Sequence, residues 1–149
     1  MDTNLVLVQK DIRSFVLAGN CLFTVANMAT GNHFTFRCQA PEVQRDPKDP
    51  VHFVKVLSGP DNTQDYEMIG MLFSGQKYVH WKKSRFGQDC PSEVAFVWLI
   101  AQLLRGTIPD TVKVFHHGYC GRCGKLLTTP ESVSLGLGPT CVAKSMMGM

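Results

Sequence analysis

The stretch CPSEVAFVWLIAQLLRG, residues 90–106, indicates the architecture of this 149-residue chain. Pro91 suits the first turn of a helix, and Arg105 followed by Gly106 suits its end. Apolar residues cover most of the surface of this helix, so we expect it to lie deep against a sheet. The apolar run is too short to span a bilayer.

Segments upstream of this helix alternate between apolar and polar residues, as strands do. They are CLFTVANM (21–28), HFTFRCQA (33–40), VHFVKVLSG (51–59) and DYEMIGMLFS (65–74). The ATGN between the first two predicts a β-hairpin, and Gly70 is a candidate bulge position. The expected fold class is therefore α+β: a small, mostly antiparallel sheet of about four strands covered by one long helix.

The segment HHGYCGRCGKLLTTPESVSLGLGPTC, residues 116–141, holds half of the six cysteines. Cys120 and Cys123 form a C-x₂-C pair flanked by glycines, which permit the tight turn of a zinc knuckle. Cys141 follows at a spacing that suits a second half-site. The remaining ligand is expected to be His116 in preference to His117, because the spacing His116-x₃-Cys120 lets one loop bring an imidazole to the same ion. If the chain enters as a strand, the two histidines point to opposite faces, so only one of them can bind.

We therefore expect a structural Zn²⁺ bound by His116, Cys120, Cys123 and Cys141. The segment has too few large apolar side chains to fold unaided, and modules of this size usually need a metal or a disulfide. A redox C-x-x-C is less favoured. A redox motif begins a helix, whereas this pair is followed by GKLLTT. Catalytic zinc is less favoured because four protein ligands leave no open position.

TTPES, residues 128–132, predicts a short helix between the two half-sites, with Thr128 as its cap. Pro139 is expected to start a second short helix that carries Cys141. This order of knuckle, helix and ligand is typical of a treble-clef-like zinc finger. We expect an α+β body over residues 1–110, followed by a zinc-binding module over residues 111–149.

The net charge of +3 lies in the second of these parts. Residues 1–110 carry 11 Lys/Arg and 11 Asp/Glu, whereas residues 111–149 carry four basic residues and one acidic residue. The module is thus mildly basic, well short of a polybasic arm. The amino-terminal residues lack the pattern of a signal peptide, and we expect a cytoplasmic protein with reduced thiols.

The stretch KYVHWKKSRF, residues 77–86, intersperses basic and aromatic residues. Cations pair with phosphates and aromatic rings stack on bases, so this composition suits single-stranded nucleic acid. The alternative is a solvated connection whose rings pack back onto the core. The candidate contacts are Lys77, Trp81, Lys82, Lys83 and Arg85, together with Arg122 and Lys125 at the knuckle.

The cysteine segment resembles the signature of a family of uncharacterised small proteins of tailed bacteriophages, which carry a CGRCG…L…P-S…G-G-P-C box. HFTFRCQ and VHFVKVLSGPDNTQDYEMIGML resemble the same family's amino-terminal region, so the resemblance covers most of the chain. It implies a phage origin, a location in the host bacterial cytoplasm and a zinc-binding end. The family has no known function, so the resemblance implies no activity.

No Ser/His/Asp arrangement, paired acids or phosphate loop stands out, so we expect no enzyme. Two hypotheses follow. One is a zinc-containing, nucleic-acid-binding accessory or regulatory protein of a phage. The other is a protein-binding inhibitor of a host enzyme or antiphage defence complex, with a purely structural zinc. Neither a membrane nor a small-molecule substrate is indicated.

Overall fold

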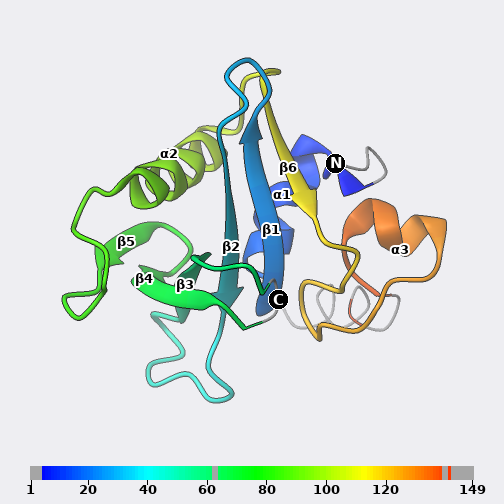
Figure 1. Ribbon diagram of the computed structural model, residues 1–149. Helices are drawn as coiled ribbons and strands as arrows, with labels where there is room; N and C mark the ends of the chain where they lie inside the picture. Colours follow the sequence, from blue (N-terminus) through cyan, green and yellow to red (C-terminus); the bar gives the residue numbers. More distant parts are fainter. Residues whose placement is uncertain (1–4, 62–63, 139–140, 142–149) are drawn as a thin grey trace.

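A computed structural model of the chain describes residues 5–61, 64–138 and 141 (Figure 1). One six-stranded antiparallel sheet has the order β5-β4-β3-β2-β1-β6. Its strands are β1 (Asn20–Asn27), β2 (His33–Gln39), β3 (Val51–Leu57), β4 (Tyr66–Phe73), β5 (Lys77–His80) and β6 (Val112–His116). The helices are α1 (Gln9–Val16), α2 (Pro91–Arg105) and α3 (Pro130–Leu135). None of the described helices is both long and apolar enough to cross a membrane.

Both longer helices pack on the same face of the sheet. Figure 1 draws α1 behind β1 and β6, with α2 nearer to β5. Alternate strand residues point toward these helices, because successive side chains of a strand face opposite ways. The resulting core combines residues of α1 (Ile12, Phe15, Val16), α2 (Phe96, Leu99, Ile100) and the strands (Phe23, Phe36, Val54, Leu72, Val114).

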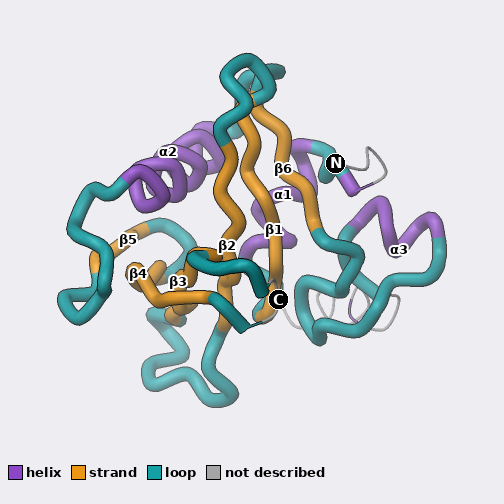
Figure 2. Tube along the Cα trace, in the orientation of Figure 1, coloured by secondary structure: helices purple, strands orange, loops and turns teal. Residues whose placement is uncertain are grey.

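The two edge strands of the sheet, β5 and β6, are separated in the sequence by α2. β1 to β5 follow one another across the sheet, and α2 then carries the chain back to β6, which pairs with β1 at the opposite edge (Figure 2). The segment after β5 and the segment after β6 therefore leave from opposite edges. This arrangement separates the two groups of candidate functional residues.

The predicted long helix is confirmed, but only one side of it is buried. Pro91 occupies the first turn, and Gly106 ends the helix with φ 90°, a left-handed conformation that glycine adopts without strain. One stripe of α2 is buried in the core, whereas Val94, Val97 and Leu104 are 52%, 41% and 47% exposed. A single helix on a sheet buries only the side that faces the strands, and no second layer covers the outer side among the described residues.

The predicted number of strands is too low, and the predicted single helix shares its face with α1. The four expected strands are present, and the register shift of β4 beside Val54 and Lys55 confirms a bulge next to Gly70. β5 lies in the stretch 77–86 and β6 lies just before the cysteine segment, and no strand was expected in either place. Strands of four and five residues show too little alternation to be recognised alone; pairing with β4 and β1 stabilises them.

The sheet continues beyond the expected boundary between residues 110 and 111. β6 begins at Val112 and pairs with β1 over five positions, so these residues belong to the sheet of the body. The cysteine segment starts after this strand, and its apolar residues form a separate cluster (Cys120, Leu127, Leu137, Cys141) with Ala18 and Val133 packed against it.

Candidate metal centre and nucleic-acid interface

Three thiols of the carboxyl-terminal segment converge on one point. The Sγ atoms of Cys120, Cys123 and Cys141 all lie within 4.8 Å of one another, a spacing at which one metal ion could bind all three. Cys120 and Cys141 are buried, and Cys123 is exposed. The spacing in the sequence thus correctly identified the three cysteines that form this cluster.

The backbone of the knuckle shapes this site. The Gly124 N–H donates to the Cys120 carbonyl at 2.9 Å, which closes the turn, and Gly124 adopts φ 78°. The N–H groups of Arg122 and Gly138 both donate to the Cys120 sulfur at 3.4 Å. Donors directed at a sulfur favour its thiolate form, which is the form that binds metal.

The thiols differ in acidity because their surroundings differ. Burial raises the pKa of Cys120, but backbone N–H groups of Gly138, Cys123 and Arg122 outweigh it and lower the pKa to about 7. Burial, together with the nearby sulfurs of Cys123 and Cys120, raises the pKa of Cys141 to about 12. Three thiolates this close repel one another, so a cation is needed to hold all of them ionised. Three soft sulfur donors fit a thiophilic cation such as Zn²⁺.

His116 does not lie with the thiols. Its Nε2–H donates to the Val133 carbonyl of α3, and its Nδ1 accepts from the Gly118 N–H at 3.0 Å. The ring is fully buried, and burial lowers its pKa, which favours the neutral form. Nε2 of His117 lies 2.9 Å from the Thr24 hydroxyl, on the sheet. Within the described residues, the structure therefore brings three thiols together, and neither of the two histidines belongs to this group.

The short helix between the half-sites is present, with its cap one residue later than predicted. Thr129, not Thr128, precedes α3, and its hydroxyl accepts the Ser132 N–H at 3.3 Å. Pro130 then occupies the first turn, where its missing N–H costs nothing. The second helix expected from Pro139 lies outside the described residues, apart from Cys141, which is helical.

The expected basic residues form two separate groups. Around β5, Lys77, Lys82 and Lys83 are exposed and Trp81 is half-buried. Arg85 is paired with Glu67 at 3.1 Å and lies over the Phe86 ring. Arg122 and Lys125 are exposed on the knuckle, which follows β6 and is hydrogen-bonded to the start of β1. The structure does not bring the two groups together.

The sheet between these groups carries basic residues that the sequence analysis did not single out. Arg37 and Lys55 are opposite one another on β2 and β3, on the face turned away from α1 and α2. We call this surface the cationic face: the strand residues directed away from the core, with Arg37, Lys55, Lys77 and Lys113 as its Lys/Arg members. By strand register, no Asp or Glu of the six strands shares this face. The alternation of the strands was the signal that could have identified it.

Half-buried rings and amides surround these cations. The Arg37 guanidinium lies 5.0 Å from the centre of the Tyr66 ring, and Lys55 Nζ donates to Gln39 at 2.8 Å. Burial lowers the pKa of Lys55, and the charge of Arg37 adds to this effect. Two cations held side by side favour an anionic partner.

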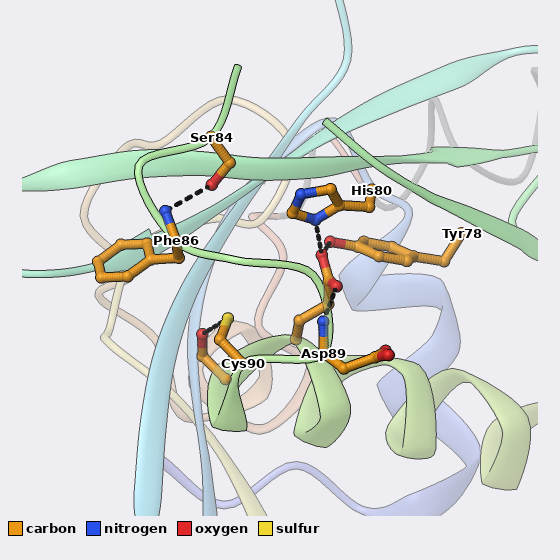
Figure 3. Close-up of polar contacts among 8 residues, drawn as sticks. Tyr78, His80, Ser84, Phe86, Asp89 and Cys90 are labelled. Carbon is orange, nitrogen blue, oxygen red and sulfur yellow. Dashed lines mark hydrogen bonds and ion pairs between the residues drawn. The ribbon is translucent and has the colours of Figure 1, made fainter. Parts of the chain in front are cut away.

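A buried carboxylate of α2 joins this helix to β5, on the face of the sheet opposite to the cationic face. Figure 3 labels its partners Tyr78, His80 and Asp89. Glu93 accepts hydrogen bonds from the Tyr78 hydroxyl, from His80 Nδ1 at 2.7 Å and from the Asp89 N–H at 2.8 Å. Burial raises the pKa of Glu93, but these three donors outweigh it and hold the pKa below its usual value. Gly70 leaves the room that the Tyr78 ring occupies. The cluster anchors the edge strand to the helix.

Comparison with known families is informative only for the cysteine segment. Residues 113–145, which include most of β6, the knuckle and α3, match a family of unknown function (DUF6011). Comparisons with curated proteins and with solved structures give no significant match. The chain thus contains an uncharacterised domain whose described part holds a cluster of three cysteines that could hold a metal ion.

Proposed function

We propose that this chain is a zinc-stabilised nucleic-acid-binding protein with an accessory or regulatory role in a phage-infected bacterium. The observation that carries the proposal is the cationic face, where Arg37 and Lys55 lie side by side on a sheet surface without strand acids. Phosphate backbones are the abundant polyanions that such a surface fits. The resemblance to proteins of tailed phages supports the phage setting.

Zinc has a structural role in this proposal. Cys120, Cys123 and Cys141 would hold the ion, and its charge would stabilise thiolates that otherwise repel. The apolar cluster of the module contains two buried leucines, Leu127 and Leu137, which is too little to fix its shape. The ion therefore acts by holding the knuckle and Arg122 beside the sheet. The proposal includes binding and no catalysis.

The test is binding of labelled DNA and RNA oligonucleotides to the full chain, followed by fluorescence anisotropy at several salt concentrations. Neutralisation of about three to four phosphates predicts a slope of log K against log[salt] of about −2 to −3 on single strands. Lys55→Gln should reduce the magnitude of this slope by about one unit or less. Lys10→Gln, on the exposed side of α1, is the matched control and should leave the slope unchanged. Absence of binding at low salt would overturn the proposal.

A second candidate function is inhibition of a host protein, favoured by the exposed stripe on α2. Val94, Val97 and Leu104 share one side of the helix at spacings of three and seven residues, and each is more than 40% exposed. Exposed apolar surface of this kind is typical of protein interfaces. Affinity purification from infected cells, with Val97→Asp as the comparison, tests this candidate: a stoichiometric host protein lost in the variant would favour it over nucleic-acid binding.

A further inference from the structure

A cavity lies where the cationic face meets the thiol knuckle. Its volume is ≈ 240 Å³, and its lining residues are Asn20, Leu22, Arg37, Tyr119 and Gly124. The first three belong to β1 and β2, and the last two to the knuckle. The cavity therefore exists only when the cysteine segment is held against the sheet.

The polar groups of the cavity have fixed orientations. The Asn20 Oδ1 accepts hydrogen bonds from Arg37 and from Gln39 Nε2, each at 3.3 Å. The amide nitrogen of Asn20 must then point the other way, toward the knuckle, where a Cβ on Gly124 would lie 3.4 Å from it. The Asn20 side-chain amide is thus a donor that points toward Gly124, where the absence of a side chain leaves space.

The apolar surface of the cavity is supplied by an aromatic ring and an aliphatic side chain. Tyr119 is 44% exposed, although it lies in a bridge with Leu126 that holds its backbone in place. Leu22 faces the cavity from β1. A half-exposed ring beside a guanidinium is the combination that binds flat heteroaromatic groups carrying a phosphate.

We infer that this cavity takes the base of one unpaired nucleotide, and that the preferred ligand of the cationic face is single-stranded nucleic acid. The inference rests on the proposed function. The volume of the cavity is below that of sites for drug-sized ligands and suits a group of the size of one nucleobase. Tyr119 stacks on the base, the Asn20 amide donates to a base acceptor, and Arg37 contacts a phosphate. A base within a duplex is stacked and paired, so it cannot enter.

The experiment uses the full, metal-containing chain and short homopolymer oligonucleotides that carry 2-aminopurine, whose fluorescence falls when the base stacks. Single-stranded DNA, single-stranded RNA and a duplex of the same length are titrated at one low salt concentration. Tyr119→Ala should weaken single-strand binding about ten-fold and abolish the fluorescence change. Tyr119→Phe, which keeps the ring, should retain both. Leu126→Ala removes an exposed side chain of the same knuckle that does not line the cavity, and should behave as wild type.

The outcomes separate this inference from the proposed function. Binding of single strands over duplex, together with loss in Tyr119→Ala and retention in Tyr119→Phe, supports the cavity as the base site. Equal binding of single strands and duplex, unaffected by Tyr119→Ala, overturns the cavity and leaves nucleic-acid binding in place. No binding of any of the three ligands overturns both. The ratio of DNA to RNA affinity identifies which strand the cavity prefers.

Discussion

The Phe15 ring of α1 packs directly against Gly121 of the thiol knuckle, so closely that a Cβ at position 121 would lie 2.6 Å from the ring. Gly121 also accepts the Asn20 N–H at 2.8 Å and donates to the Gly136 carbonyl at 2.8 Å. The thiol knuckle is therefore attached to the main core through the Phe15 ring and these backbone hydrogen bonds.

This contact predicts that Gly121→Ala destabilises the protein. The added methyl group must displace the Phe15 ring from a close-packed core, an overpacking cost of about 1–3 kcal/mol. Thermal or urea unfolding of the full chain measures it. Gly138→Ala is the matched control, because nothing lies within 4 Å of a Cβ there. Equal stability of the two variants would show that the knuckle does not pack as described.

Metal loss should affect the module much more than the sheet. Purified protein should contain roughly one zinc per chain by elemental analysis, and Cys123→Ser should lower that content whereas Cys90→Ser should not. On chelation, hydrogen exchange should rise over residues 117–138, which have little core of their own, and stay slow in β1 to β4. Protein without stoichiometric metal, or an intact module after chelation, would contradict the proposed role of zinc.

The contacts of His116 predict that it stabilises the module without binding metal. His116→Ala removes a buried ring whose two nitrogens pair with backbone groups of Val133 and Gly118, so we expect a loss of about 1–3 kcal/mol. Zinc content should be unchanged in His116→Ala and in His117→Ala. A fall in metal content in one of these variants would identify its imidazole as the fourth ligand.

The Glu93 cluster predicts a specific response to pH. Because the pKa of Glu93 is lowered in the folded state, its contribution to stability is fully present above the unfolded-state pKa of about 4.3 and is lost as pH falls through the folded-state value. Glu93→Gln should destabilise the protein by about 2–4 kcal/mol at pH 7, since it leaves buried partners unpaired.

The difference between wild type and Glu93→Gln should shrink below about pH 4 in urea titrations, because Glu93 takes up a proton first in the unfolded state and, at still lower pH, in the folded state. Glu67→Gln, which affects the partly exposed pair with Arg85, should cost at most about 1 kcal/mol at either pH. A constant difference for Glu93→Gln across this range would mean that the carboxylate charge does not contribute.

Local sequence patterns were sufficient to predict the elements that have clear alternation, turn residues or helix-end residues. The β1–β2 hairpin, β3, β4 and both ends of α2 follow from alternation, turn residues, Pro91 and Gly106, because these depend on interactions between near neighbours. The glycine-flanked C-x₂-C and its spacing to Cys141 likewise identified the three thiols that lie together, since a tight turn brings the first two side by side.

Other features depend on contacts between distant residues, which no local pattern records. β5 and β6 exist because longer strands pair with them, and His116 is directed away from the thiols by the Val133 carbonyl. Arg37 and Lys55 are 18 positions apart in the sequence, so no local pattern links them, and antiparallel pairing of β2 and β3 makes them neighbours. The knuckle then closes a cavity beside them because Phe15 fits against Gly121. Residue type and spacing thus specified the chemistry, whereas strand pairing and packing of the core specified where that chemistry lies.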